Sequence, residues 1–215
     1  MAITVILAWY FCSTEQYNGV DISHHNDVKW EVLANDSNIE FCYIKATEGK
    51  SYKDSDCSCN VKKANECNMH VGIYHYFRTN TSVKAQFDNF MSVYKRVKTD
   101  LIPAIDVGIK GNVYDDTTND SLALLIDLFF KEFNQYPLVY LGDLGAYRTL
   151  PVIYKCPLWY RILWISRIVP FLPMKQVGIK QIGDDPTDIN YCSDINMLIR
   201  KSSTTRWTDV ASGVR

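Results

Sequence analysis

The sequence has almost no excess of charge of either sign. Its 215 residues include 23 lysines and arginines against 24 aspartates and glutamates, which gives a formal net charge of -1 at pH 7. A protein that binds a polyanion usually carries a clear basic patch or stripe. The balance therefore argues against a nucleic-acid partner and against a polybasic membrane module.

A long apolar run is also missing. No stretch approaches the roughly 20 residues that a helix needs to cross a bilayer, so we expect no membrane span. Residues 2–12 are apolar and have about the length of a signal-peptide core, yet no Lys or Arg precedes them and bulky residues precede Cys12. Residues 1–16 are thus interpreted either as a signal peptide or as an N-terminal strand.

The chain contains no internal repeat, low-complexity tract or linker rich in proline and glycine. We therefore expect one domain over residues 17–199, followed by a polar tail at residues 200–215.

The sequence contains seven cysteines, an odd number, and their spacing is uneven. Cys42 lies in an apolar run, as a buried thiol does. Cys57, Cys59 and Cys67 lack the second close pair of a structural zinc site, so disulfides or plain thiols are expected, with no metal and no cofactor.

Short apolar runs alternate with longer amphipathic ones. The expected strands are residues 19–23, 41–46, 71–77, 101–107 and 138–141, and the expected helices are 28–35, 57–67, 82–97, 117–133 and 144–150. Residues 102–107 are apolar on both faces, as in a buried parallel strand. Residues 158–165, 178–182 and 187–190 are interpreted as further strands. The pattern predicts an α/β fold, an irregular TIM-like (β/α) barrel of one domain, with an open doubly wound sheet as the alternative.

Polar side chains occur where these strands end, and strand ends form the mouth of a barrel. They are Asp21, Lys45, Glu48, Tyr74, His75, Tyr76, Asp106, Tyr140, Trp164, Gln181 and Asp188. Any one of them could be a surface cap or a satisfied core group, but their coincidence favours a site. We expect Asp21, Asp106 and Asp188 to share one cleft lined by Tyr74 or Tyr76, because all three would stand at the same ends of parallel strands.

Three motifs in consecutive strands resemble glycoside hydrolase family 25, the Chalaropsis-type lysozymes or muramidases. They are GVDISHH at residues 19–25, YIKATEG at 43–49 and GIYHYFR at 72–78, followed by QFDNF at 86–90 and IPAIDV at 102–107. The resemblance covers residues 17–192 and weakens beyond Tyr140. It implies peptidoglycan glycan strands as the partner, cleavage of the β-1,4 bond after N-acetylmuramic acid, and a secreted, extracellular or virion-associated location.

One departure from the family falls on the catalytic pair. The family's Asp-Val-Glu triplet lies on Asp106-Val107-Gly108, so the glutamate that the family uses as proton donor is absent. The resemblance implies that Asp106 is the stabilising carboxylate and that Glu48 or Asp21 is the nearest substitute acid. General acid catalysis contributes about 10² to 10⁴ in rate. We therefore expect reduced activity, restored about 10²-fold or more by Gly108→Glu if the groove is intact.

The remaining assignments also come from the resemblance. It places catalytic residues at Asp21, Asp106 and Asp188 and substrate contacts at Glu48, Tyr74, Tyr76, Tyr140, Trp164 and Gln181. The seventh-strand motif Trp-Gln-Tyr is replaced by residues 180–182 (Lys-Gln-Ile), which removes two aromatic sugar contacts. His75 is expected to point inward as a packed barrel residue.

Two functions stay open at this point. The first is a muramidase of reduced activity, which retention of four site carboxylates favours. The second is an inactive glycan-binding or structural protein on the same fold, for instance in a phage particle, which the missing glutamate and aromatics favour. The tail at residues 200–215 is the expected contact for any protein partner.

Overall fold

The computed structural model describes residues 17–108, 110–142, 163–165, 177–183, 188–192 and 194–201. Within these residues the strands are β1 (Tyr17–Ile22), β2 (Ile39–Glu48), β3 (Tyr52–Lys53), β4 (His70–Tyr76), β5 (Ala104–Val107), β6 (Leu138–Leu141), β7 (Leu163–Ile165), β8 (Val177–Gly183) and β9 (Asp188–Cys192). The helices are α2 (Trp30–Asn35), α3 (Cys57–Glu66), α4 (Val83–Tyr94), α5 (Asp116–Phe133) and the short 3₁₀ helix η2 (Ile195–Met197).

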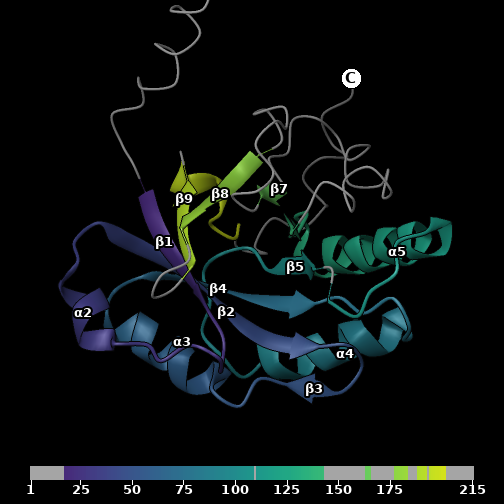
Figure 1. Ribbon diagram of the computed structural model, residues 1–215, viewed down its shortest axis with the longest axis horizontal. Coiled ribbons are helices and arrows are strands. Elements are labelled where there is room, and N and C mark those ends of the chain that lie inside the picture. Colours follow the sequence, from purple (N-terminus) through teal and green to yellow (C-terminus); the bar gives the residue numbers. More distant parts are fainter. Residues whose placement is uncertain are drawn as a thin grey trace, which may run out of the picture.

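The sheet closes on itself. Its order is β1-β9-β8-β7-β6-β5-β4-β2-β3, and β1 also pairs with β2, so eight strands form a ring and β3 extends β2 as a hairpin (Figure 1). Within this ring the successive neighbours β1, β2, β4, β5, β6, β7 and β8 run parallel to one another. The predicted irregular barrel is thus confirmed, and the alternative of an open sheet is wrong, because β1 is paired on both sides.

Strand β9 differs from the sequence-based expectation. It runs antiparallel to both of its neighbours, β1 and β8. Its first residue, Asp188, therefore pairs with Asp21 near the end of β1. The expectation that Asp188 ends a parallel strand is wrong, yet the reversal brings its backbone to the same mouth of the barrel.

Alternation along the strands divides the apolar side chains into two cores. Val20, Ile44 and Ile73 face outward into a large cluster with helices α3, α4 and α5. Phe41 and Tyr43 face inward, into a smaller cluster inside the barrel. Gly19 and Gly72 leave room for these inward rings, because a Cβ there would lie 2.3 Å from Phe41 and 2.2 Å from Tyr43.

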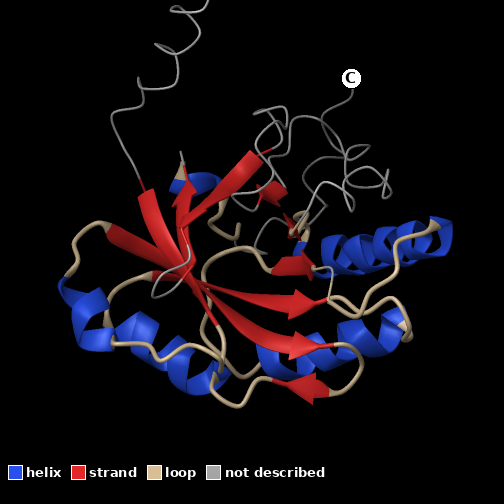
Figure 2. Cartoon of the chain, in the orientation of Figure 1, coloured by secondary structure: helices blue, strands red, loops and turns tan. Residues whose placement is uncertain are grey.

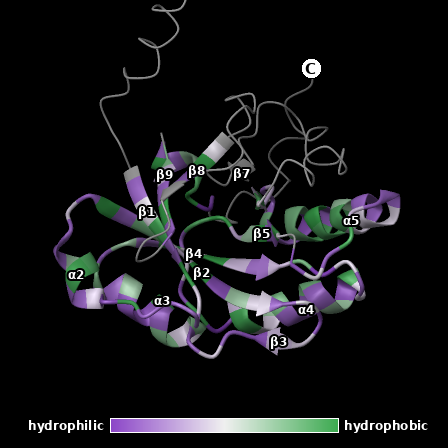
Figure 3. Ribbon diagram, in the orientation of Figure 1, coloured by the Kyte–Doolittle hydropathy of each residue, from purple (hydrophilic) through white to green (hydrophobic). Residues whose placement is uncertain are grey.

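The helices lie on the outside of the strands (Figure 2) and show mixed hydrophilic and hydrophobic residues, as expected with one face buried (Figure 3). Ser82 caps α4 by accepting a hydrogen bond from the amide of Ala85, and Asp115 caps α5 by accepting one from the amide of Thr118 at 2.8 Å.

The predicted helix at 144–150 and most of the predicted strand at 158–165 lie outside the described residues. In the described part, no helix has the length and apolar character to cross a bilayer.

Candidate active site

A chain of hydrogen bonds links four strands, β1, β6, β8 and β9, at the mouth of the barrel. The Asn190 amide of β9 donates to Asp21 Oδ2 at 2.7 Å, and the Gln181 amide of β8 donates to the same oxygen at 3.5 Å. The Tyr140 hydroxyl of β6 in turn donates to Gln181 Oε1 at 3.1 Å. Three of the sequence-predicted site residues therefore form one network, and Asn190, which pattern reasoning did not select, completes it.

Asp21 and Asp188 form a pair of neighbouring carboxyls. They are register partners on β1 and β9, and a hydrogen bond joins their side chains. Burial raises the pKa of Asp21 well above its ordinary value, and the charge of Asp188 adds to the rise. The Asn190 amide opposes it, and Asp106 contributes a smaller increase. Two carboxyls in such contact share a proton and carry one negative charge between them.

Asp106 lies near the end of β5, between Tyr76 and Tyr140 in register. Its Oδ1 is buried and has no hydrogen-bond partner among the described residues. Burial raises the pKa of Asp106 to about 7; Lys45 works against this rise, and the charges of Glu48 and Asp188 add to it. Near neutral pH this carboxyl therefore exists in both protonation states.

Glu48 is held in an ion-pair cluster at the end of β2. Its Oε2 accepts from Lys45 Nζ at 2.7 Å, and its Oε1 accepts from Arg78 Nε at 2.9 Å and from a second Arg78 nitrogen. Burial favours the neutral acid, but these hydrogen bonds outweigh it and lower the pKa of Glu48. Glu48 is thus a carboxylate at neutral pH, unsuited to the role of substitute acid.

Lys45 is one of the predicted strand-end residues, whereas the sequence pattern did not indicate Arg78 as a member of the site. The inward positions of β2 follow a period of two through Phe41, Tyr43 and Lys45, which agrees with the place of Lys45 at the mouth. Arg78 follows β4 beyond its last residue, where no strand period applies. Its backbone is held by Gln86, which accepts from the Arg78 amide at 2.8 Å and donates to its carbonyl at 2.9 Å.

Tyr76 fills the space beside Gly108. A Cβ on Gly108 would lie 2.6 Å from the Tyr76 hydroxyl oxygen and 2.7 Å from a ring carbon, so no side chain fits there without moving the ring. The ring is fixed by its hydroxyl, which donates to the carbonyl of Lys110 at 3.1 Å. Lys45 Nζ lies 5.2 Å and Arg78 Cζ 4.9 Å from the ring centroid.

Tyr74 and His75, the other two ring-bearing candidates on β4, lie on opposite faces of the strand. Tyr74 belongs to the inner cluster, and besides burial the charges of Asp21 and Asp106 raise its pKa, which places it at the mouth. His75 points the other way, so its expected inward position is wrong: it packs against Phe90 of α4 and contacts Thr47 and Gln86. The physical reason is alternation, since neighbours of an inward residue face outward.

Trp164 is placed by its backbone alone. It pairs with Tyr140 in the β6–β7 ladder, as the strand assignment requires, while its side chain lies outside the described part. Its value as a sugar platform therefore stays a prediction.

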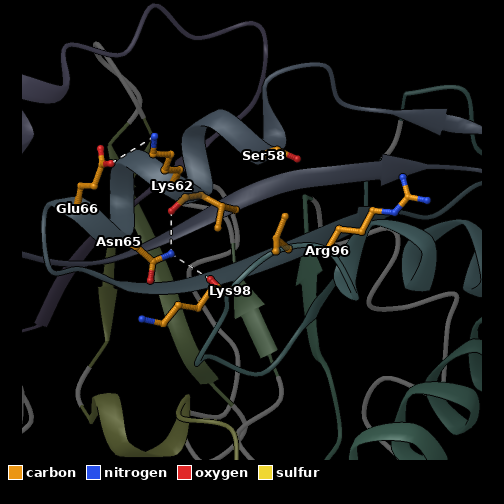
Figure 4. A pocket seen from close by; sticks show the side chains of 8 residues that line it. Ser58, Lys62, Asn65, Glu66, Arg96 and Lys98 are labelled. Carbon is orange, nitrogen blue, oxygen red and sulfur yellow. Dashed lines mark hydrogen bonds and ion pairs between the residues drawn. The ribbon is translucent and has the colours of Figure 1, made fainter.

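Two pockets of about 350 Å³ each lie on the described surface. One is lined by α3 and by the segment after α4, including Lys62, Asn65 and Arg96, and contains none of the predicted site residues (Figure 4). The other is lined by Glu48, Tyr52 and Arg78 with Lys50, Asn80 and Thr81. Through Glu48 and Arg78 this second pocket adjoins the mouth of the barrel.

The family model for glycosyl hydrolases family 25 matches residues 20–159, more than half of the chain. The chain belongs to this family. The structure resembles the family 25 lysozyme from Aspergillus fumigatus, with a TM-score of 0.68, 18% identity and coverage of 92% of this chain and 98% of that one. It also resembles a muramidase from Acremonium alcalophilum, with a TM-score of 0.67, 22% identity and coverage of 82% and 93%. Both likenesses establish the fold.

Among curated proteins, Lysozyme M1 of Streptomyces globisporus is 38% identical over 81 residues, which cover 37% of this chain and 27% of that protein. An Escherichia coli protein, YegX, is 25% identical over 138 residues and is matched over 51% of its length. The chain thus spans between about a quarter and a half of the length of these relatives. The identification of family 25 from sequence motifs is confirmed.

Proposed function

We propose that this family 25 chain hydrolyses the β-1,4 bond after N-acetylmuramic acid in bacterial peptidoglycan, at a lower rate than members that carry the motif glutamate. The observation that carries the proposal is the set of interacting carboxyls at one barrel mouth: Asp188 raises the pKa of both Asp21 and Asp106. Glycosidases cleave with two carboxyl groups on either side of the scissile bond. The printed names of the relatives, lysozyme and muramidase, support the substrate.

The surroundings of these carboxyls suit a sugar chain. Tyr74, Tyr140 and Gln181 give the mouth aromatic and amide groups, which contact sugars by packing and hydrogen bonding. The pocket beside Glu48 continues this surface with polar side chains. A glycan strand could therefore cross the mouth of the barrel and extend toward β3. To reach peptidoglycan the chain would act at the cell wall, by secretion or as part of a virion.

A second candidate function is supported by one observation, the Tyr76 ring in the space beside Gly108. A site that only binds glycan needs no proton donor at residue 108, and a fixed aromatic ring there adds a contact surface. Under this alternative the chain is a glycan-binding protein on a muramidase barrel.

Incubation of the chain with purified peptidoglycan separates the two functions. Borohydride reduction of newly formed reducing ends identifies the sugar at the cut, and we expect N-acetylmuramic acid. The rate should fall about 10²- to 10⁴-fold below that of a family member with the glutamate, which is the contribution of a general acid. An Asp21→Asn, Asp106→Asn double variant is the blank. Binding to the glycan with no release above this blank would establish the second function instead.

A further inference from the structure

The carboxyls of the mouth differ in the partners that their oxygens already have. Both oxygens of Glu48 accept hydrogen bonds from Lys45 and Arg78. A carboxylate held by two cations keeps its charge and has no proton to transfer. Glu48 therefore acts as a fixed anion that holds the two cations in place.

Asp21 is engaged in a different way. Its Oδ2 accepts from the amides of Asn190 and Gln181, and its carboxyl is hydrogen-bonded to Asp188. The Asn190 amide favours the ionised form of Asp21, but burial and the negative charge of Asp188 outweigh it and raise the pKa of Asp21, so the charge of the pair lies on Asp188. The Asp21–Asp188 pair thus suits the stabilisation of positive charge on the sugar.

Asp106 has an oxygen without such a partner. Its Oδ1 is buried and unbonded among the described residues, and leaving a buried acceptor unpaired costs free energy unless a ligand group meets it. In the described part of the chain, the titratable groups around it are Lys45 and Glu48 of β2, Tyr74 and Tyr76 of β4, Tyr140 of β6, Asp21 of β1 and Asp188 of β9. Burial raises the pKa of Asp106 to about 7, so a fraction of the molecules carries the proton on Asp106 at neutral pH.

The strand order places Asp106 opposite the Asp21–Asp188 pair. In the ring of eight strands β5 lies four positions from β9 and three from β1. Asp106 and Asp188 therefore stand on opposite sides of the mouth. A glycosidase needs this arrangement, with a proton donor on one side of the scissile bond and an anion on the other.

We propose that Asp106 is the proton donor to the leaving sugar oxygen in this chain, taking over the task of the absent residue-108 glutamate. The proposal rests on the proposed hydrolysis of peptidoglycan. In the first step the Asp106 proton moves to the glycosidic oxygen while the C1–O bond breaks and its electron pair stays on that oxygen. Water then adds its hydroxyl to C1 and returns a proton to Asp106. The Asp21–Asp188 pair carries the negative charge that faces the sugar cation.

The test compares two substrates that differ in their need for an acid. Cleavage of glycan strands releases a poorly acidic sugar alcohol, whereas cleavage of a 4-nitrophenyl β-glycoside whose last sugar is N-acetylmuramic acid releases a nitrophenolate that needs little protonation. Asp106→Asn should lose about 10²- to 10⁴-fold in kcat/KM on glycan strands and less than about tenfold on the nitrophenyl glycoside. Asp127→Asn, an exposed substitution on α5, is the matched control and should change neither rate.

A pH profile gives a second readout that does not depend on a variant. On glycan strands, kcat/KM of the parent chain should fall as pH rises through about 7, where Asp106 loses its proton, and on the nitrophenyl glycoside this fall should be absent.

Three results would overturn the assignment. Equal losses of Asp106→Asn on both substrates would make Asp106 the stabilising carboxylate. A loss confined to glycan strands in Tyr76→Phe or Glu48→Gln, with Asp106→Asn unaffected, would transfer the role to that residue. A parent chain that binds glycan but hydrolyses neither substrate would refute the proposed function, and this proposal with it.

Discussion

The hydroxyl oxygen of Tyr76 lies 2.6 Å from the point where a Cβ on Gly108 would stand. The two residues belong to neighbouring elements, since Tyr76 pairs with Asp106 in the β4–β5 ladder and Gly108 follows that strand. The loop behind them is held as well, because the Asn112 amide donates to the carbonyls of Gly108 at 2.8 Å and Phe77 at 2.9 Å. The Tyr76 ring thus occupies the space that a glutamate side chain at residue 108 would need.

Restoring the glutamate alone should therefore fail. Gly108→Glu forces the Tyr76 ring out of its place and should lower the free energy of unfolding by about 1–3 kcal/mol, as overpacking does. We expect its rate on peptidoglycan to stay within about tenfold of the parent chain. The double variant Gly108→Glu, Tyr76→Ala should exceed the parent by about 10² or more. Tyr76→Ala alone is the control, and full activity in the single variant would show that the ring moves freely.

Much of the barrel could be predicted from the sequence, because strands buried on both faces and amphipathic helices leave strong local patterns. The predicted strand at residues 138–141 coincides with β6, and the predicted helix at 57–67 with α3 within one residue. The direction of β9 could not be predicted in this way. A short run such as residues 188–192 has the same period in either direction, and its orientation is decided by pairing with β1 and β8.

The site likewise contains residues that could be predicted from the sequence and contacts that could not. Asp21, Asp106 and Gln181 were found because they lie at strand ends, where position in the sequence implies position at the mouth. The contact of Tyr76 with Gly108 depends on side-chain direction across two strands, and no sequence period encodes it. The ion pair of Glu48 with Arg78 could not be predicted for a similar reason, since Arg78 contacts Glu48 from the loop that follows β4.

Glu48→Gln should change both stability and the pH dependence of catalysis. Lys45, which is 8% exposed, would lose its carboxylate partner, and we expect a loss of about 1–3 kcal/mol in the free energy of unfolding. Because the Glu48 charge helps to raise the pKa of Asp106, its removal should move the alkaline limb of kcat/KM to lower pH. Glu66→Gln breaks an exposed ion pair with Lys62 and should cost less than about 0.5 kcal/mol. An unshifted pH profile would contradict the coupling.

Thr47→Val should destabilise the layer between β4 and α4. His75 Nε2 faces the Gln86 oxygen at 3.2 Å, which leaves Nδ1 to accept from the Thr47 hydroxyl at 2.8 Å. Valine keeps the shape but leaves the buried Nδ1 unpaired, so we expect a loss of about 1–3 kcal/mol by urea denaturation. Thr47→Ser retains the hydroxyl and should cost clearly less. Equal losses in both variants would assign the effect to packing.

The same histidine predicts acid sensitivity. Burial lowers the pKa of His75 from 6.5 to about 4 in the folded chain. Between these pH values the unfolded chain binds a proton there and the folded chain does not, so stability should fall as pH drops from about 6.5 to about 4. His75→Gln removes this group, and its stability should decline less over that window. Parallel curves for the two proteins would refute the assignment.

The C-terminal truncation point should decide whether the barrel loses stability. The Arg200 amide donates to the Asp100 carbonyl at 2.7 Å, and the Lys201 amide donates to Gln135 Oε1 at 2.7 Å. Arg200 also donates to the Thr99 carbonyl at 3.2 Å. Removal of residues 200–215 breaks all three bonds, each of which contributes about 1 kcal/mol, and should lower Tm by about 5–10 °C. Removal of residues 202–215 keeps them and should leave Tm nearly unchanged in calorimetry. A large drop in the shorter deletion would show that residues 202–215 pack on the barrel and are not a separate polar tail.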